Sequence, residues 1–259
     1  MEIAIRIARI GNRLLNIVVT GIILLLFLYG GYSLWDTYMS AQGAFLSDEL
    51  LSYKPQPGEG ANPSLEDLMA INPDVAGWIT VNDTHIDYPI VQGKDDMEYI
   101  NKDVYGEFSL SGSVFLSCMN KKDFSDYYNL LYGHHMANGA MFSDVMSFTE
   151  KSYFDKHKTG ELYLPDKTMK IDFFACVKTA ASDSVIYNPQ NISKETENQK
   201  VFLDYVRENA VCYRENIAGR KNQIIGLSTC SEAETNGRVI LFGRLTQITE
   251  NSQKQKKAR

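Results

Sequence analysis

The chain has little of what marks several common protein classes. It holds only four cysteines in 259 residues. They are scattered and form no C-x-x-C pair, so neither a disulfide framework nor a structural zinc site is indicated. The net charge is −6, and no basic stripe with interleaved aromatic residues occurs, which argues against a nucleic-acid binder. No metal or cofactor is expected. The hydrophobic share of 44% and the seven prolines are typical of a globular protein with one domain and an appendage.

The longest stretch without a charged residue lies near the N-terminus. Residues 14–35 contain no charged side chain, and a helix of that length would reach about 33 Å, enough to cross a bilayer core. Tyr29, Tyr32 and Trp35 would mark one interface, as an aromatic belt does. A cleaved signal peptide is the competing interpretation, although its apolar region is normally shorter and ends at a small-residue cleavage site. A buried core helix is the other alternative, and we favour an uncleaved anchor.

Basic residues precede this stretch. Arg6, Arg9 and Arg13 lie within the first 13 residues, so the positive-inside rule predicts a cytoplasmic N-terminus. Everything after Asp36 is then predicted to lie outside the cell. The sequence therefore predicts a single-pass protein of the cell membrane.

Composition changes twice after the predicted anchor. Residues 36–53 are amphipathic and predicted to be helical, whereas residues 54–62 contain two prolines and two glycines, as linkers do. Pro63 opens a predicted short helix to about Ile71, with Ser64 in a capping-box pattern. The predicted divisions are an N-terminal segment at 1–13, an anchor at 14–35, a juxtamembrane helix and linker at 36–62, a folded domain at 63–248 and a basic tail at 249–259.

From Trp78 onward the pattern is mainly one of short strands. Strands separated by turn residues are predicted at 77–81, 86–91, 113–117, 128–132, 162–164 and 169–179. Helices are predicted at 141–157 and from Ser193, acting as an N-cap, to about Cys212. Because no βαβ rhythm appears, we predict a mainly β fold, a closed or nearly closed barrel with helical insertions.

Two apolar runs near the C-terminus form the most informative pattern. Residues 223–229 and 238–245 flank a polar segment that ends in an Asn-Gly pair, which predicts a β-hairpin. Cys230 ends the first predicted strand and Arg238 opens the second. A thiolate beside a fixed cation suits covalent acyl chemistry. A buried strand-end cysteine and a solvated arginine would give the same pattern.

The four histidines differ in context. His85 lies in a turn and His157 lies between two lysines, and both are predicted to be solvated. His134 and His135 follow a predicted strand, so they stand at a strand end, as Cys230 does. Because adjacent strand residues point to opposite faces, only one of the two can face the cysteine. A cysteine, a histidine and an arginine from distant segments can act as nucleophile, acid/base and charge stabiliser.

The residues around these groups resemble the signature of sortases, the membrane-anchored cysteine transpeptidases of Gram-positive bacteria. Leu227–Cys230 followed by Arg238 resembles the active-site strands of the family, and Gly133-His134 resembles its Gly-His element. The similarity to class B sortases is closer and covers about residues 63–248. It extends, in chain order, through Asn72–Ile79, Ile86–Gly93 and Tyr132–Met136.

This resemblance implies a closed eight-stranded barrel whose domain is catalytic. It implies Cys230 as the nucleophile, His134 as the acid/base and Arg238 as the group that orients the substrate or stabilises the oxyanion. His135 would be a non-catalytic neighbour. A hydrolytic cysteine peptidase with the same three residues is the alternative enzyme, and an inactive membrane-tethered binding module is the alternative outside enzymes.

The resemblance also implies the substrates, which are surface or pilin proteins with a C-terminal sorting signal. A Leu-Pro-x-Thr-Gly-like or Asn-Pro-x-Thr-Asn-like signal would be cleaved after Thr through a thioester. The acceptor would be an amine of a peptidoglycan cross-bridge or a pilin lysine. Ser228, Thr229 and Tyr187 are implied as substrate contacts. The chain departs from class B members that carry an acid directly after the cysteine: a serine stands there, and Glu232 and Glu234 follow, so the role of an acid in this loop stays open.

Overall fold

The computed structural model of the protein describes residues 1–44, 47–56, 61–136, 138–219, 221–230 and 236–248. The chain divides into two compact units, Met1–Gln42 and Gly43–Arg259. The first unit consists of helix α1 (Glu2–Ala44), which runs two residues past the unit boundary. Its Glu2–Met39 part contains an 18-residue window with a mean hydropathy of 2.3 and no buried residue, so by length and composition this helix could cross a membrane. The predicted anchor lies within α1, and the predicted basic tail lies outside the described residues.

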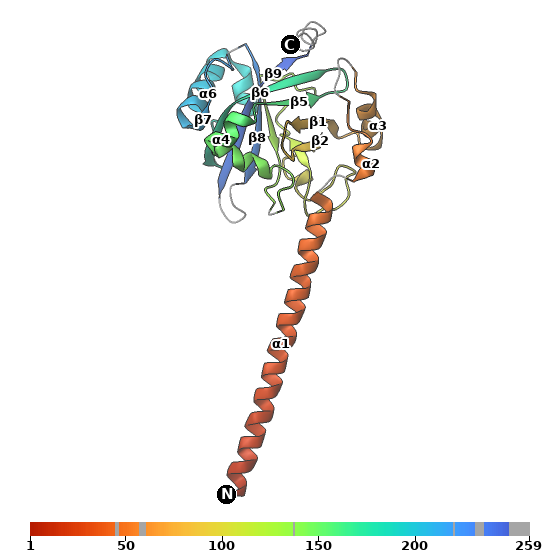
Figure 1. Ribbon diagram of the computed structural model, residues 1–259, viewed down its shortest axis with the longest axis vertical. Helices are drawn as coiled ribbons and strands as arrows, with labels where there is room; N and C mark the ends of the chain where they lie inside the picture. The colour runs from red at the N-terminus through yellow and green to blue at the C-terminus, as the bar shows by residue number, and fades with distance from the viewer. Residues whose placement is uncertain (45–46, 57–60, 137, 220, 231–235, 249–259) are drawn as a thin grey trace. The chain divides into compact units, whose positions relative to one another are not determined.

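The second unit is built around a closed barrel (Figure 1). Within the described residues one sheet has the strand order β5-β1-β2-β3-β4-β8-β9-β6-β7, and an additional pairing of β5 with β6 closes it. Eight strands therefore form the ring, and β7 is added outside it, on β6. The predicted closed eight-stranded barrel is confirmed. The strands are β1 (Val75–Val81), β2 (Asp87–Val91), β3 (Val114–Leu116), β4 (Tyr128–Tyr132), β5 (Thr159–Tyr163), β6 (Thr168–Ala180), β7 (Ala210–Tyr213), β8 (Gln223–Cys230) and β9 (Gly237–Gln247).

Helices cover the barrel on two sides. Figure 1 shows α6 on one side and α2 and α3 on the other. The helical segments of this unit are α2 (Asp48–Leu51), α3 (Pro63–Ile71), η1 (Glu98–Ile100), η2 (Ser143–Thr149), α4 (Lys151–Lys156), α5 (Pro189–Lys194) and α6 (Thr196–Asn209).

This covering explains why several strands are apolar on both faces. In β1, Ile79 belongs to the main core cluster, whereas the adjacent Trp78 belongs to a second cluster that includes Leu50 of α2 and Leu65 of α3. Adjacent strand residues point to opposite faces. Both Ile79 and Trp78 are fully buried. A strand that is covered on both faces reads as a continuous apolar run rather than an alternating one.

The predicted short helix at 63–71 is confirmed, but its predicted capping box is wrong. The N-cap is Asn62, and its side chain makes no cap hydrogen bond. Instead, Asn62 Nδ2 donates to Leu164 O over 2.6 Å. The segment before α3 is thus tied to the barrel. Part of the predicted linker at 54–62 lies outside the described residues.

Three predicted helices are each divided. The helix predicted at 36–53 is the end of α1 followed by α2. The helix predicted at 141–157 is a 3-10 segment, η2, and then α4, because Glu150 between them is extended (φ −88°, ψ 123°). The third, predicted from Ser193 to Cys212, is broken by Glu195, which is also extended (φ −134°, ψ 140°).

The C-terminal end of that third helix was predicted wrongly. Residues Ala210–Tyr213 form β7, in which Cys212 pairs with Cys176 of β6. The run Ala-Val-Cys-Tyr is β-prone, and backbone pairing with the free edge of β6 overrides a helical pattern. The predicted cap Ser193 is also wrong, because Asn188 is the residue whose side chain caps α5 by accepting from Asn191 N.

Candidate active site

Two parallel strands bring the candidate residues to one edge of the barrel. Strand β4 pairs in parallel with β8, with Tyr132 opposite Ser228. Gly133 N donates to Ser228 O over 3.1 Å, which extends the ladder beyond the end of β4. The chain after β4 and the end of β8 therefore lie at the same edge. His134 follows β4 by two residues and Cys230 is the last residue of β8, so both lie at this edge.

The predicted β-hairpin adds the arginine to the same edge. Strands β8 and β9 pair in antiparallel fashion, with Cys230 opposite Arg238 in the register. The side chain of Cys230 lies outside the described part of the structure, as do Glu232 and Glu234. Its backbone position nevertheless places the cysteine at the strand end next to the arginine. The sheet therefore brings the end of β4, the end of β8 and the start of β9 together, although His134 and Arg238 are more than a hundred residues apart in the sequence.

A cleft of about 260 Å³ opens at this edge. It contains every predicted site residue whose side chain is described. Its lining consists of Asp96, Met97, Ile100, Phe115, Tyr132, Gly133, His134, Ala181, Tyr187, Ser228, Thr229 and Arg238. A concave, mostly apolar site with a few convergent polar groups is typical of a substrate pocket.

His134 lies in the wall of the cleft, and its neighbour does not. Its ring is half-buried, whereas His135 is exposed and forms an isolated β-bridge with Met141. The Nε2 atom of His134 lies 2.9 Å from Ile100 O. Because a carbonyl oxygen only accepts, Nε2 must carry a hydrogen in this contact. The opposite ring nitrogen, Nδ1, is then the one left to exchange a proton.

The loop that carries His134 is closed by backbone contacts. Phe142 N donates to His134 O over 3.0 Å. A Cβ atom at position 133 would lie 2.6 Å from Cγ of Phe142, so only glycine fits directly before the histidine. The close approach of Phe142 to the backbone thus gives the Gly-His pair a local structural reason.

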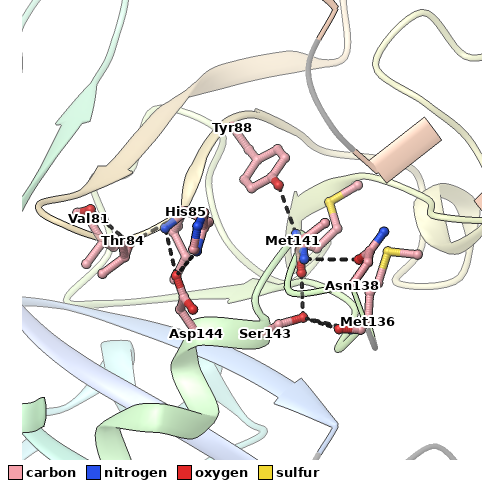
Figure 2. Close-up of polar contacts among 11 residues, drawn as sticks. Val81, Thr84, His85, Tyr88, Met136, Asn138, Met141, Ser143 and Asp144 are labelled. Carbon is pink, nitrogen blue, oxygen red and sulfur yellow. Dashed lines mark hydrogen bonds and ion pairs between the residues drawn. The ribbon is translucent and has the colours of Figure 1, made fainter. Parts of the chain in front are cut away.

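Side chains hold the far end of the same loop (Figure 2). Met136 N donates to Ser143 Oγ over 2.8 Å, and Ser143 Oγ contacts Ala140 O at 2.5 Å. Tyr88 Oη, from β2, accepts a hydrogen bond from Met141 N over 2.9 Å. Met141 has a positive φ of 56°, an uncommon conformation for a non-glycine residue. The contacts of Ser143 and Tyr88 therefore hold a backbone shape that the sequence alone does not favour.

Arg238 provides the positive charge of the cleft. Its Nη1 donates to the carbonyl of Gly237 over 2.9 Å, and the side chain is half-buried. Within the described part of the chain it forms no ion pair with a carboxylate. A guanidinium held in this way can still donate hydrogen bonds to a bound carbonyl or oxyanion.

Aromatic and hydroxyl side chains also line the cleft. Tyr187 Oη lies 3.0 Å from Ser228 Oγ, and its ring stacks on Tyr132 with an interplanar angle of 11°. Burial raises the pKa of Tyr132 above its ordinary value, so this phenol stays neutral. Thr229 is buried beside Ser228. These side chains give the cleft a stacking surface and hydroxyl groups.

The segment that carries Tyr187 is fixed by Asp183. Thr179 Oγ1 and Tyr205 Oη each donate to Asp183 Oδ2, over 2.6 and 2.7 Å. The backbone amide of Ile186 donates to its other oxygen. Burial alone would raise the pKa of Asp183, but these hydrogen bonds together hold that pKa below its ordinary value. The carboxylate is thus a fixed anchor for the loop after β6.

Sequence reasoning missed part of the cleft lining. Asp96, Met97 and Ile100 lie around η1, and Phe115 belongs to β3. No local pattern distinguishes Asp96, Met97 and Ile100 from a surface turn, and the predicted strand that contains Phe115 carries no sign of a site, because their meeting depends on the pairing of β2 with β3. Only the folded barrel reveals them as part of the site.

The remaining histidines and cysteines do not line the cleft. The prediction that His157 is solvated is wrong: it is 4% exposed and stacks on Tyr153 with a centroid distance of 3.8 Å. His85 is exposed, and its Nδ1 lies 3.0 Å from Asp144 Oδ2, as Figure 2 shows. Cys118 is exposed, while Cys176 and Cys212 are buried. Among the described residues no group of three or more His, Cys, Asp or Glu side chains could hold a metal ion.

Comparisons with known proteins identify this closed eight-stranded barrel as a sortase fold. The chain is 32% identical over 184 residues to sortase B of Listeria monocytogenes, covering 70% of this chain and 73% of the relative. It is 28% identical over 245 residues to sortase B of Staphylococcus aureus, covering 92% and 99%. No protein-family model matches the chain.

Solved structures give the same result. A Streptococcus pyogenes class B sortase involved in pilus biogenesis is 46% identical, with a TM-score of 0.64, and the match covers 70% of this chain and 97% of that one. The Staphylococcus aureus sortase B–substrate complex has a TM-score of 0.67 at 28% identity, covering 73% and 87%. The chain belongs to the class B sortase family and is a sortase-type cysteine transpeptidase.

Proposed function

We propose that this transpeptidase cleaves a C-terminal sorting signal after its threonine and transfers the released protein to an amine. The observation that carries the proposal is the meeting of His134, Arg238 and the register position of Cys230 at one edge of the barrel. The cleft there suits a Leu-Pro-x-Thr-Gly-like or Asn-Pro-x-Thr-Asn-like peptide, because it combines an apolar surface with a few hydroxyl groups. No cofactor enters this proposal.

The first half-reaction forms a thioester. The Cys230 thiolate attacks the threonine carbonyl, and Arg238 stabilises the oxyanion that develops. As the tetrahedral intermediate collapses, the C–N bond breaks and His134 gives its proton to the departing amine. The hydrogen bond from Nε2 of His134 to Ile100 O supports Nδ1 as the proton-transferring atom. The step therefore uses Cys230 as the thiolate and His134 as the proton donor.

The second half-reaction resolves the thioester. An acceptor amine loses a proton to His134 and attacks the acyl carbon, and the Cys230 thiolate leaves. Two solved relatives bear on the acceptor: one is a Streptococcus pyogenes sortase involved in pilus biogenesis, and the other is sortase B from the type II pilus of Streptococcus pneumoniae, 35% identical to this chain. These relatives support a pilin lysine as the acceptor, with a peptidoglycan cross-bridge as the other amine.

The apolar helix indicates where the reaction takes place. Helix α1 could cross a membrane by length and composition, and Arg6, Arg9 and Arg13 precede its uncharged part. The positive-inside rule supports a cytoplasmic N-terminus. The catalytic unit would then lie outside the cell, where surface proteins and amine acceptors are found.

An amine-partition assay tests the proposed function. The full chain in detergent is incubated with a sorting-signal peptide and either triglycine or a peptide that carries one lysine side chain, and the products are identified by mass spectrometry. A transpeptidase forms a new amide to one of the amines. Hydrolysis alone, at every amine concentration, would identify a peptidase instead, and binding without cleavage would identify an inactive binding module.

A further inference from the structure

One acid stands in the wall of the substrate cleft. Asp96 lines the cleft together with Met97 and Ile100, and it is half-buried. Among the described lining residues it is the only carboxylate, while Arg238 and His134 supply the basic groups. The cleft therefore carries charges of both signs.

The carboxylate of Asp96 is held in place but not neutralised. Its Oδ1 accepts from Cys118 N over 2.6 Å, and its Oδ2 accepts from Ser117 Oγ over 3.1 Å. The Cys118 thiol also hydrogen-bonds to this carboxylate. A carboxylate has about four acceptor positions, so these three bonds leave capacity for a further donor. No lysine or arginine forms an ion pair with Asp96 within the described residues. A fixed carboxylate without a cation is a strong acceptor for a ligand.

The negative charge acts on the surrounding wall. Burial is the main cause that raises the pKa of the Tyr132 phenol, and the charge of Asp96 raises it further. The thiol of Cys118 behaves in the same way, with burial first and Asp96 second. A bound side chain next to this wall would experience the same field.

We propose that Asp96 is a specificity-determining residue, which selects sorting signals that place a hydrogen-bond-donating side chain, an amide or an ammonium group, against it. An acidic side chain at the same signal position would meet a like charge, which is strongly unfavourable at an interface. An amide or ammonium group would instead donate to the unused carboxylate positions. The inference rests on the proposed function, and it narrows the class of signals that the cleft accepts.

The test compares peptides that differ in one charge. Sorting-signal peptides carrying Gln, Glu or Lys at each position upstream of the threonine are assayed for kcat/KM with the full chain in detergent. We expect wild type to prefer Gln over Glu at one position by at least about tenfold. Asp96→Asn should reduce that ratio to within about threefold, because Asn is isosteric but uncharged.

Two variants separate charge selection from a structural role. Asp95→Asn removes the adjacent acid, which is exposed and does not line the cleft, so the Gln/Glu ratio should stay at the wild-type value. Ser117→Ala removes one partner of the Asp96 carboxylate but keeps the charge, so the ratio should also be kept.

Equal Gln/Glu ratios for wild type and Asp96→Asn at every position would overturn the proposal, as would an equal fall of the ratio in Asp95→Asn. A wild-type chain that processes none of the peptides would refute the proposed function itself, and this inference with it.

Discussion

At the scale of single residues, backbone contacts orient the candidate catalytic groups. The ring of His134 is oriented by a hydrogen bond to the carbonyl of Ile100, and Arg238 is oriented by a hydrogen bond to the carbonyl of Gly237. Carbonyl groups are fixed by the fold, so both side chains are oriented before a substrate arrives. Such preorganisation is what makes electrostatic stabilisation of a transition state effective.

The paired histidines give a sharp residue-scale prediction. His134→Ala should reduce acyl-enzyme formation by ~10²–10⁴-fold, the usual contribution of general acid catalysis. His135→Ala is the matched control, and it should stay within a few-fold of wild type because that side chain is exposed. Stopped-flow measurement of acylation on a sorting-signal peptide distinguishes the two. An inactive His135→Ala beside an active His134→Ala would reverse the assignment.

Asp183 gives a prediction on acid stability. Its lowered folded-state pKa means that it stabilises the protein fully above the unfolded-state value of about 3.9. The stabilisation is lost as the pH falls through the folded-state pKa. Asp183→Asn should cost about 1–3 kcal/mol near neutral pH and lose less on acidification than wild type does. Tyr205→Phe, which removes one donor, should be intermediate. Thermal unfolding from about pH 6 to about pH 2.5 checks this; parallel curves for wild type and Asp183→Asn would contradict it.

The sequence motifs anticipated part of the cleft lining and not the rest. His134, Tyr187 and Arg238 are recognisable because they stand beside short motifs at strand ends or helix starts. Asp96 is not, because it lies in a turn whose partner segment is 21 residues away. His157 was misjudged because its flanking lysines indicate a surface, while its ring stacks on an aromatic neighbour. Local sequence patterns therefore predict strand ends well, but they do not predict which distant segments will be in contact.

At the scale of elements, the loop between β4 and η2 sets the position of the histidine. Ser143 belongs to η2 and is buried, and it bonds to both Met136 and Ala140 (Figure 2). Removing this hydroxyl removes the hydrogen bonds that hold the loop, and it changes no residue that lines the cleft. Misplacement of a catalytic group by about 1 Å can cost 10²-fold in rate.

We therefore expect Ser143→Ala to lower kcat by about tenfold or more, with little change in KM. Thr149→Ala is the matched control, since Thr149 Oγ1 makes the same kind of bond, to Met146 O, within η2 but away from the loop. Steady-state kinetics and the pH profile of kcat/KM are the readouts. A loss of similar size in Thr149→Ala would attribute the effect to η2 as a whole.

Elements with simple periodicity were predictable, and divided ones were not. Strand β4 and helix α3 occupy the predicted ranges because a short β-prone run next to turn residues defines the strand and a proline marks the helix start. The breaks at Glu150 and Glu195 have no signal in propensity, because glutamate is a good helix former. Strand β7 exists because an edge of β6 is available. Strand β7 was therefore determined by tertiary pairing and not by local propensity.

At the scale of the molecule, the segments before the barrel belong to its packing. Leu50 of α2 is buried in the cluster that contains Trp78. Lys54 Nζ lies 2.5 Å from Asp87 Oδ2, and Asn62 is 6% exposed. The predicted boundary at residue 63 therefore falls inside a network of contacts. We propose that the folded domain begins before α2.

Two truncations test that boundary. A chain that starts at Ser47 retains these contacts, and a chain that starts at Pro63 loses them. The shorter chain should be less stable by at least about 2 kcal/mol, from the burial of one leucine and one buried hydrogen bond. Urea unfolding of the two proteins measures the difference. Equal urea midpoints and equal slopes for the two proteins would contradict this proposal and support a domain boundary at residue 63.

The central claim is that Cys230 carries the acyl group, and trapping the intermediate tests it most directly. The full chain in detergent is mixed with excess sorting-signal peptide without an acceptor amine, quenched in acid and analysed by intact-mass and peptide-level mass spectrometry. The account predicts an added mass equal to the acyl group of the peptide that ends at threonine, one water less than the free acid. This mass should be located on Cys230, removed by hydroxylamine and absent from Cys230→Ala. An adduct on Cys118, or cleavage that persists in Cys230→Ala, would contradict it.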